Sequence, residues 1–160
     1  MIDLADPATE EFLHGGPSLV TCTVDGDGQP HVSRVWGVTI VDADSGLLRL
    51  LVHAEDAVAL TNIRAGRPIA VTATNVTNFH SLQFKGLGVS VEDLTTADEA
   101  KQAVYTDAFL TDVHMTYGYA MDLIQRFAAR ATIPCLITVD SSFDQTPGPS
   151  AGVAIDQSTP

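Results

Sequence analysis

The feature that most constrains the fold is a succession of short β-rich runs, each closed by residues that favour tight turns. The first run, Ser18–Val24, ends at the sequence Asp-Gly-Asp-Gly at 25–28, which is a strong hairpin signal. The second run, at 29–41, ends at another turn over 42–46, and a third run follows at 47–53. Runs this short, joined by turns, predict adjacent antiparallel strands in a meander.

One helix is predicted between the third and fourth strands. In residues 54–66 the apolar side chains of Ala57, Leu60 and Ile63 recur near helical spacing. Gly66 suits the left-handed residue that follows many helices. The same segment predicts a short helix inserted within the sheet.

Two further strands are expected at 68–76 and 80–94. Gly86 and Gly88 interrupt the second of these strands. Glycine inside a strand marks a bulge or a tight corner, so the chain is expected to bend here as it would in a small barrel.

A long helical segment is predicted over 96–131. Thr96 and Glu99 match the spacing of a capping box at its start, and Gly118 suggests a break within it. Beyond the break, apolar residues recur at a spacing of four: Tyr119, Leu123 and Phe127.

The chain after the helical segment completes the predicted domain. Pro134 is expected to end the helix, and 135–143 to form a sixth strand. Residues 146–160, rich in Pro, Gly, Ser and Thr, are expected to form a tail outside a domain of 1–145. The pattern predicts a mainly β fold of the α+β class: a six-stranded antiparallel barrel with helices packed outside.

The charge of the chain narrows the classes of molecule that it is expected to bind. The net charge is −12, which disfavours nucleic acid and anionic membrane surfaces, and no apolar run is long enough for a membrane helix. The first residues carry acids where a secretion signal needs bases, so a cytoplasmic protein is expected. Five of the eight Lys and Arg residues lie within 32–88, which suggests an anion site in that stretch.

Few sequence motifs for catalysis or metal binding are present. Cys22 and Cys135 lie in apolar β runs without CxxC spacing or a nearby His, so buried free thiols are predicted. The sequence contains no phosphate-binding glycine loop, no HExxH and no GxSxG. The five histidines are scattered singly, and no metal site is predicted.

Trp36 is the only tryptophan, and it lies on the same predicted strand face as Arg34. It has two interpretations. The ring packs in the barrel core or an interface, or it forms a wall against a flat ligand whose phosphate or carboxylate Arg34 binds. In the second case Gly37 would allow the ligand to approach the backbone closely. Composition favours the first interpretation.

Four segments together resemble the pyridoxamine 5′-phosphate oxidase-like family, the FMN-binding split β-barrel proteins. They are 20–38, 48–74, 80–88 and 143–152, and the resemblance covers roughly residues 10 to 150. The hairpin around Asp-Gly-x-Pro-His-Val, at the start of the second strand, is widespread in that superfamily.

The resemblance implies a six-stranded split barrel that forms a homodimer, with FMN in a groove between the subunits. Basic side chains of the second strand and of the helix after the third strand grip the phosphate in this family, so Arg34 is the expected first contact and Lys85 a second positive charge. The cofactor-binding positions that the resemblance implies are Arg34, Val35, Trp36, Gly37, His53, Ala57, Val58, Gln83 and Lys85.

The chain departs from the family at the helix start. Ala57, Val58 and Ala59 stand where flavin-binding members place Ser, Arg and Lys, and Glu55 and Asp56 add negative charge. Each lost charge-assisted hydrogen bond costs about 1.5–3 kcal/mol, so two losses weaken phosphate binding by about two to four orders of magnitude.

Three hypotheses follow. The leading one is a flavin-binding split-barrel protein, an FMN-dependent oxidoreductase if it turns over, with weakened or modified binding. The second is a non-catalytic dimeric scaffold with a degenerate groove. The third keeps an enzyme but replaces FMN with a deazaflavin or with haem, for which His53 or His80 would be the axial ligand.

Overall fold

A computed structural model describes residues 4–155. The strands are β1 (Ser18–Val24), β2 (Pro30–Asp42), β3 (Leu47–His53), β4 (Pro68–Thr74), β5 (Ser81–Val91), β6 (Thr132–Asp144) and β7 (Val153–Ala154). The helices are α1 (Pro7–His14), α2 (Ala57–Arg64), α3 (Thr96–Tyr117) and α4 (Met121–Ile124), which continues as a 3-10 turn, Gln125–Phe127. No helix among these residues is long and apolar enough to cross a membrane.

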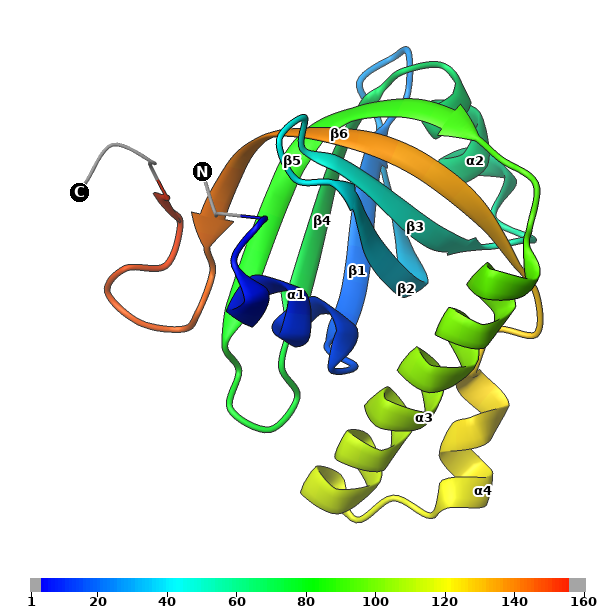
Figure 1. Cartoon of the computed structure of the whole chain (residues 1–160), viewed down its shortest axis with the longest axis vertical. Coiled ribbons are helices and arrows are strands. Elements are labelled where there is room, and N and C mark those ends of the chain that lie inside the picture. Colours follow the sequence, from blue (N-terminus) through cyan, green and yellow to red (C-terminus); the bar gives the residue numbers. More distant parts are fainter. Residues whose placement is uncertain (1–3, 156–160) are drawn as a thin grey trace.

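Six strands close into an antiparallel barrel (Figure 1). Their order is β3-β2-β1-β4-β5-β6, and pairing of β3 with β6 completes the ring. The short β7 pairs with the end of β6. The predicted six-stranded barrel is therefore confirmed, as are the meander of the first three strands and the helix between the third and fourth.

Alternate side chains of the strands fill the barrel. Leu19 and Thr21 of β1, Val71 of β4 and Phe84 of β5 are each at most 1% exposed. A side chain at Gly86 would collide with the backbone of β6, and the β5–β6 register shifts next to this residue. The predicted barrel corner in β5 is thus confirmed, because only glycine lets the two backbones approach so closely.

The helices lie outside the strands (Figure 1). α2 closes one end of the barrel, where Asn62 donates a hydrogen bond of 3.0 Å to the hydroxyl of Thr23. α3 packs against β2 and, with α4, projects away from the barrel. The Tyr105 hydroxyl on α3 donates to the carbonyl of Pro17 at 2.7 Å, which ties the helix to the start of β1.

An ion pair joins α3 to the barrel wall. Nε and Nη2 of Arg49 on β3 donate to the two carboxylate oxygens of Asp98 at 2.8 and 2.9 Å, and the side chains are only 19% and 7% exposed. Asp98 also accepts a hydrogen bond from the backbone of Thr95. The Arg49 hydrogen bonds, more than any other cause, hold the pKa of Asp98 well below its usual range, against the opposing effect of burial.

The structure corrects the expected start of α3. The N-cap is Thr95 rather than Thr96, and the reciprocal acid of the capping box is Asp98 rather than Glu99. Both pairs have the spacing of a capping box, so the sequence pattern does not distinguish them. Arg49 on the barrel decides between the two pairs, because its guanidinium binds Asp98 and so places this residue at the start of the helix.

Pro134 was also wrongly predicted to end the helix. α4 ends at Ile124, and Pro134 lies inside β6, which starts at Thr132. There it pairs with Leu51 of β3, and its carbonyl accepts a hydrogen bond of 2.8 Å from the backbone of Glu92. The predicted break is correct, because the backbone after α3 is left-handed at Gly118, with φ of 71°.

The two cysteines are free thiols, as predicted. Cys135 is buried, and burial raises the pKa of its thiol to about 12. Cys22 is only half-buried, on the outer face of β1. The predicted burial is therefore wrong for Cys22. The Cys135 thiol has neither the exposure nor the lowered pKa that a reactive cysteine needs.

Part of the predicted tail packs on the barrel. The Thr146 hydroxyl accepts a hydrogen bond of 3.0 Å from the backbone of Ser81, and β7 pairs with β6. Residues 156–160 lie outside the described part of the chain.

Replacing Asp98 tests the ion pair. Asp98→Ala leaves the Arg49 charge half-buried and unpaired, so the free energy of unfolding in urea is expected to fall by about 3–5 kcal/mol. Glu99→Ala, in the same helical turn but exposed, is the control and should change the free energy of unfolding by less than about 0.5 kcal/mol.

The stability of the protein is also expected to depend on pH through Asp98. Because the pKa of Asp98 is lowered in the folded state, the stabilisation that the ion pair provides is complete above about pH 4 and is lost as the pH falls below that value. An unchanged pH dependence in Asp98→Asn would contradict this account.

Candidate functional site

Arg34 projects from the outer face of β2 toward α3. Its Cζ atom lies 4.7 Å from the ring centroid of Phe109 and 5.2 Å from that of Trp36, which is within the range of cation–π attraction. No carboxylate of residues 4–155 forms an ion pair with it. The guanidinium is therefore held by aromatic rings while its charge stays available to an anion.

An apolar hollow of about 390 Å³ opens beside Arg34, between α3 and α4. Three of its large side chains are strongly exposed: Tyr119 by 53%, Leu123 by 46% and Phe127 by 72%. The residues that line it are Arg34, Phe109, Leu110, Val113, Tyr119, Leu123, Ile124 and Phe127. An apolar hollow of this size with one cation at its edge suits a flat ring that carries an anionic group.

Trp36 does not form an open wall for a ligand. Its side chain is 3% exposed and meets Phe109 edge-on at a centroid distance of 6.3 Å. The ring belongs to the hydrophobic core because α3 covers this part of β2, in agreement with the first interpretation of the sequence. Val35 is fully buried in the same core, and Gly37 lines a different cavity together with Leu51.

The start of α2 is occupied by a carboxylate side chain of the protein itself. Asp56 is the N-cap, and its Oδ1 accepts a hydrogen bond of 3.0 Å from the backbone of Ala59. Nε2 of His31 lies 2.8 Å from the same oxygen. The Ser33 hydroxyl donates a short hydrogen bond to Oδ2. The helix terminus at which the family resemblance places a phosphate is thus occupied by a carboxylate.

The Asp56 carboxylate keeps its charge. Burial alone would raise its pKa, but the hydrogen bonds from its three partners outweigh burial and lower the pKa below the ordinary value. Ala57 and Val58, both exposed, add no donor side chain. A dianionic phosphate therefore does not fit at the start of α2, because it would meet an ionised carboxylate, and neither a lysine nor an arginine lies at the helix start to hold it.

Gln83 and Lys85 lie on the outer face of β5, far from Arg34. The Lys85 ammonium stands over the ring of Phe143 at 4.2 Å, and Gln83 donates to the Thr72 hydroxyl at 3.0 Å. Strands β1 and β4 separate β5 from β2. Three strand spacings of about 4.8 Å place Arg34 and Lys85 roughly 14 Å apart, so within one subunit they do not hold the same phosphate.

The two histidines named as axial haem ligands lie apart from this hollow. His53 ends β3, and its Nδ1 accepts a hydrogen bond of 3.2 Å from the backbone of Glu55. Nδ1 of His80, before β5, lies 3.1 Å from the Thr146 hydroxyl. Neither histidine lines the hollow beside Arg34. Within residues 4–155, no three His, Cys, Asp or Glu side chains gather as metal ligands would.

Several residues of the site were not predicted. The four-residue spacing of Tyr119, Leu123 and Phe127 indicated a helical face, but nothing in the sequence placed that face beside β2. His31 and Ser33 gave no signal, because their partner Asp56 is more than twenty residues away in the chain.

Comparison of the sequence with protein-family models and with curated proteins gives no match. Several solved structures are similar in fold, and two of them serve as examples. A candidate pyridoxamine 5′-phosphate oxidase from Lactobacillus delbrueckii has a TM-score of 0.51 and 17% identity, over 89% of this chain and 99% of that one. HupZ of Group A Streptococcus has a TM-score of 0.56 and 15% identity, over 93% and 100% of the two chains. The resemblance drawn from the sequence is thus confirmed at the level of the fold.

Replacing Asp56 tests its role at the start of α2. Asp56→Ala removes the N-cap and is expected to lower the free energy of unfolding by about 0.5–2 kcal/mol, whereas Asp56→Asn keeps a capping oxygen and should cost less. Urea denaturation measures both values, with Glu55→Ala, at the exposed neighbouring position, as the control. Equal stability of the Ala variant and the unaltered protein would show that the carboxylate does not hold the helix start.

Proposed function

We propose that this protein is a dimeric flavin-binding protein, in which Arg34 binds the anionic end of the ligand and the hollow between α3 and α4 receives its flat ring. One observation carries the proposal: the unpaired Arg34 lies over two aromatic rings at the edge of an apolar hollow. Flavins and deazaflavins combine a flat ring system with a negatively charged chain, which is the chemistry that this surface suits.

The proposed binding mode differs from the one that the family resemblance implies. The Asp56 carboxylate at the start of α2 excludes a phosphate there, so Arg34 is the single strong contact to the anion. Affinity for FMN is therefore expected to be weak. An oxidoreductase role stays a prediction from the resemblance, and no step of catalysis is assigned to a residue.

A second subunit is part of the proposal because one part of the outer face of the barrel, across β2, β1 and β4, is apolar. Val32 on β2 is 65% exposed, and Val20 beside it on β1 is 37% exposed. Val32 lies in register with Cys22 of β1, which pairs in turn with Ala70 of β4. Small apolar side chains across three strands favour the pairing of two copies about a two-fold axis.

Two observations favour a second candidate function. The filled start of α2 and the buried Trp36 together close the positions where the family would hold FMN. A dimeric scaffold that binds no cofactor is consistent with both facts. Titration with flavin separates the two candidates.

Flavin binding is expected to depend on Arg34. Titration of the purified protein with FMN, followed by quenching of flavin fluorescence, should give saturable binding that Arg34→Gln weakens by about tenfold or more, because a charge-assisted hydrogen bond is lost. Binding of riboflavin, which lacks the phosphate, should be weakened less by Arg34→Gln than binding of FMN. Arg64→Gln, an exposed arginine at the end of α2, serves as the control.

Two outcomes would contradict the flavin proposal. No quenching at millimolar FMN would favour the scaffold, and equal affinity of the Arg34→Gln variant would show that the anion binds elsewhere.

The proposed dimer is tested at Val32. Val32→Asp places a charge in the apolar face and is expected to convert the dimer to a monomer in sedimentation-velocity experiments. Val41→Asp, at a 50% exposed valine near the end of the same strand, is the matched control and should leave the dimer intact. A chain that sediments as a monomer before any substitution would remove the dimer from the proposal.

A further inference from the structure

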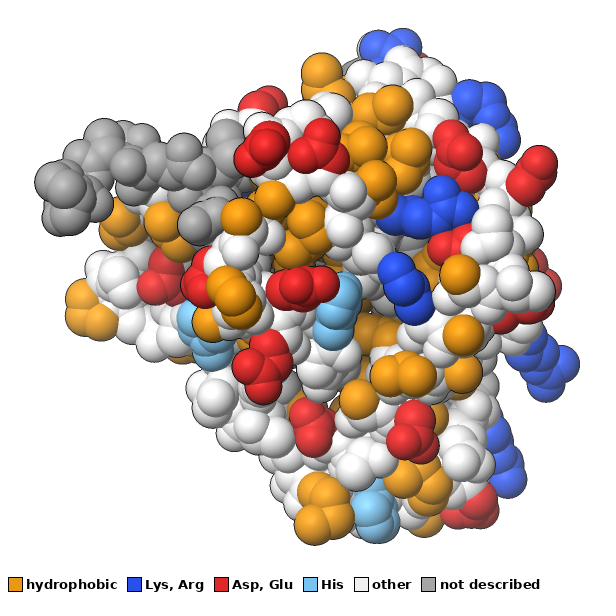
Figure 2. Space-filling view, viewed as in Figure 1, with side chains coloured by type: hydrophobic (Ala, Val, Ile, Leu, Met, Phe, Trp, Pro, Cys, Tyr) orange, Lys and Arg blue, Asp and Glu red, His pale blue; other side chains and the backbone are white. Residues whose placement is uncertain are grey.

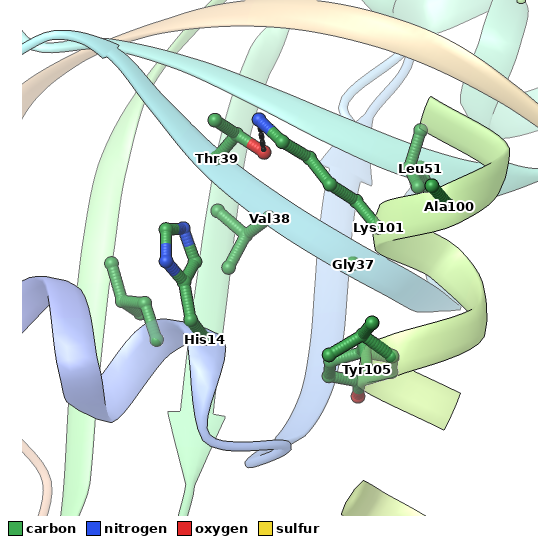
Figure 3. A pocket seen from close by; sticks show the side chains of 10 residues that line it. His14, Gly37, Val38, Thr39, Leu51, Ala100, Lys101 and Tyr105 are labelled. Carbon is green, nitrogen blue, oxygen red and sulfur yellow. Dashed lines mark hydrogen bonds between the residues drawn. The ribbon is translucent and has the colours of Figure 1, made fainter. Parts of the chain in front are cut away.

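A second cavity, of about 270 Å³, lies between α1, β2, β3 and α3 (Figure 3). It shares no lining residue with the hollow beside Arg34. Figure 2, which has the same view as Figure 1, shows a depression with apolar side chains inside it. His and Lys or Arg side chains flank this depression. The cavity is therefore a separate candidate site.

The walls of this cavity are apolar. Leu13 of α1, Val38 of β2, Leu51 of β3 and Val104 of α3 line it. Tyr105 presents its ring, while its hydroxyl points away and donates to the Pro17 carbonyl. Such a lining favours a compact hydrocarbon body, and the volume is below the range of about 300–1,000 Å³ found for larger ligands.

Two polar side chains, of which one is a lysine, stand beside this apolar space (Figure 3). Lys101 of α3 donates a hydrogen bond of 3.2 Å from Nζ to the Thr39 hydroxyl, and it forms no ion pair within residues 4–155. An ammonium has three donors, so two remain for a ligand. His14 of α1 is the second, and its Nδ1 lies 3.8 Å from Glu10.

Among residues 4–155, no carboxylate lines the cavity. This is notable in a chain of net charge −12, which contains 20 acidic and only 8 basic residues. A cationic ligand would find no partner here, and the negative field of the protein opposes a ligand with two or more negative charges. A single negative charge is what one lysine can neutralise.

We propose that this cavity binds a small monocarboxylic acid with a compact apolar body, such as a short aliphatic or aromatic acid. Its carboxylate accepts a hydrogen bond from Nζ of Lys101, and its body lies against Val38, Leu51 and Val104. The absence of a side chain at Gly37 leaves room at the back of the cavity, where a Cβ atom would press on Leu51. This inference does not depend on flavin binding at Arg34.

Calorimetric titration with hexanoate and benzoate tests the site, with hexylamine as the probe of opposite charge. Saturable binding of an acid is expected, and none of the amine. Lys101→Gln should weaken binding by about tenfold or more, because the charge-assisted hydrogen bond is lost. Ala100→Phe, on an exposed position that lines the cavity, should abolish binding by filling the space. Arg126→Gln, an exposed arginine on the 3-10 turn, is the control for net charge.

Three results would overturn the proposal: no binding of either acid, equal affinity in Lys101→Gln, or equal affinity for hexylamine. Val104→Phe provides a second filling variant at a residue that is 67% exposed, so the test does not rest on the folding of one variant. Retained binding in both filling variants would also place the acid elsewhere.

Discussion

Arg49 and Asp98 connect the barrel to α3 through two hydrogen bonds between opposite charges, in a place where water reaches neither side chain freely. The position of α3 depends on this contact. Because α3 forms one wall of the hollow beside Arg34 and one wall of the cavity beside Lys101, the ion pair indirectly shapes both candidate sites. Together with the Tyr105 hydrogen bond to Pro17, this ion pair thus helps to decide which surfaces of β2 and β3 are open.

A second constraint acts at the start of α2. A helix N-terminus attracts an anion, and here the Asp56 side chain supplies it from within the chain. His31 and Ser33 also bind this carboxylate, so a phosphate at this terminus would lie against an ionised group. The barrel is similar in fold to the solved structures, but the start of α2 is occupied by a carboxylate of the chain itself. Likeness of fold alone therefore does not assign a cofactor.

Much of the fold was predictable because its signals are local. Turn residues such as those at 25–28 and glycines such as Gly86 act through their own backbone, and the alternation in β1 follows directly from burial of one face. The N-cap of α3 was predicted wrongly because two neighbouring residues gave equal local signals. Thr95 and Thr96 both suit an N-cap, and the distant Arg49 decided between them.

The sequence by itself determined the strands, the tight turns between the first three of them, the inserted helix and the arginine on the second strand, since each depends on residues within a few positions. Closure of the barrel, in contrast, needs the pairing of β3 with the distant β6. Only the tertiary structure decided what surrounds that arginine. Phe109 lies beside Arg34, and Asp56 beside His31, because strand pairing and helix packing bring together residues far apart in the chain. Sites are built from such long-range contacts, whose free energies are set by burial and charge in the folded molecule, so no local pattern encodes them.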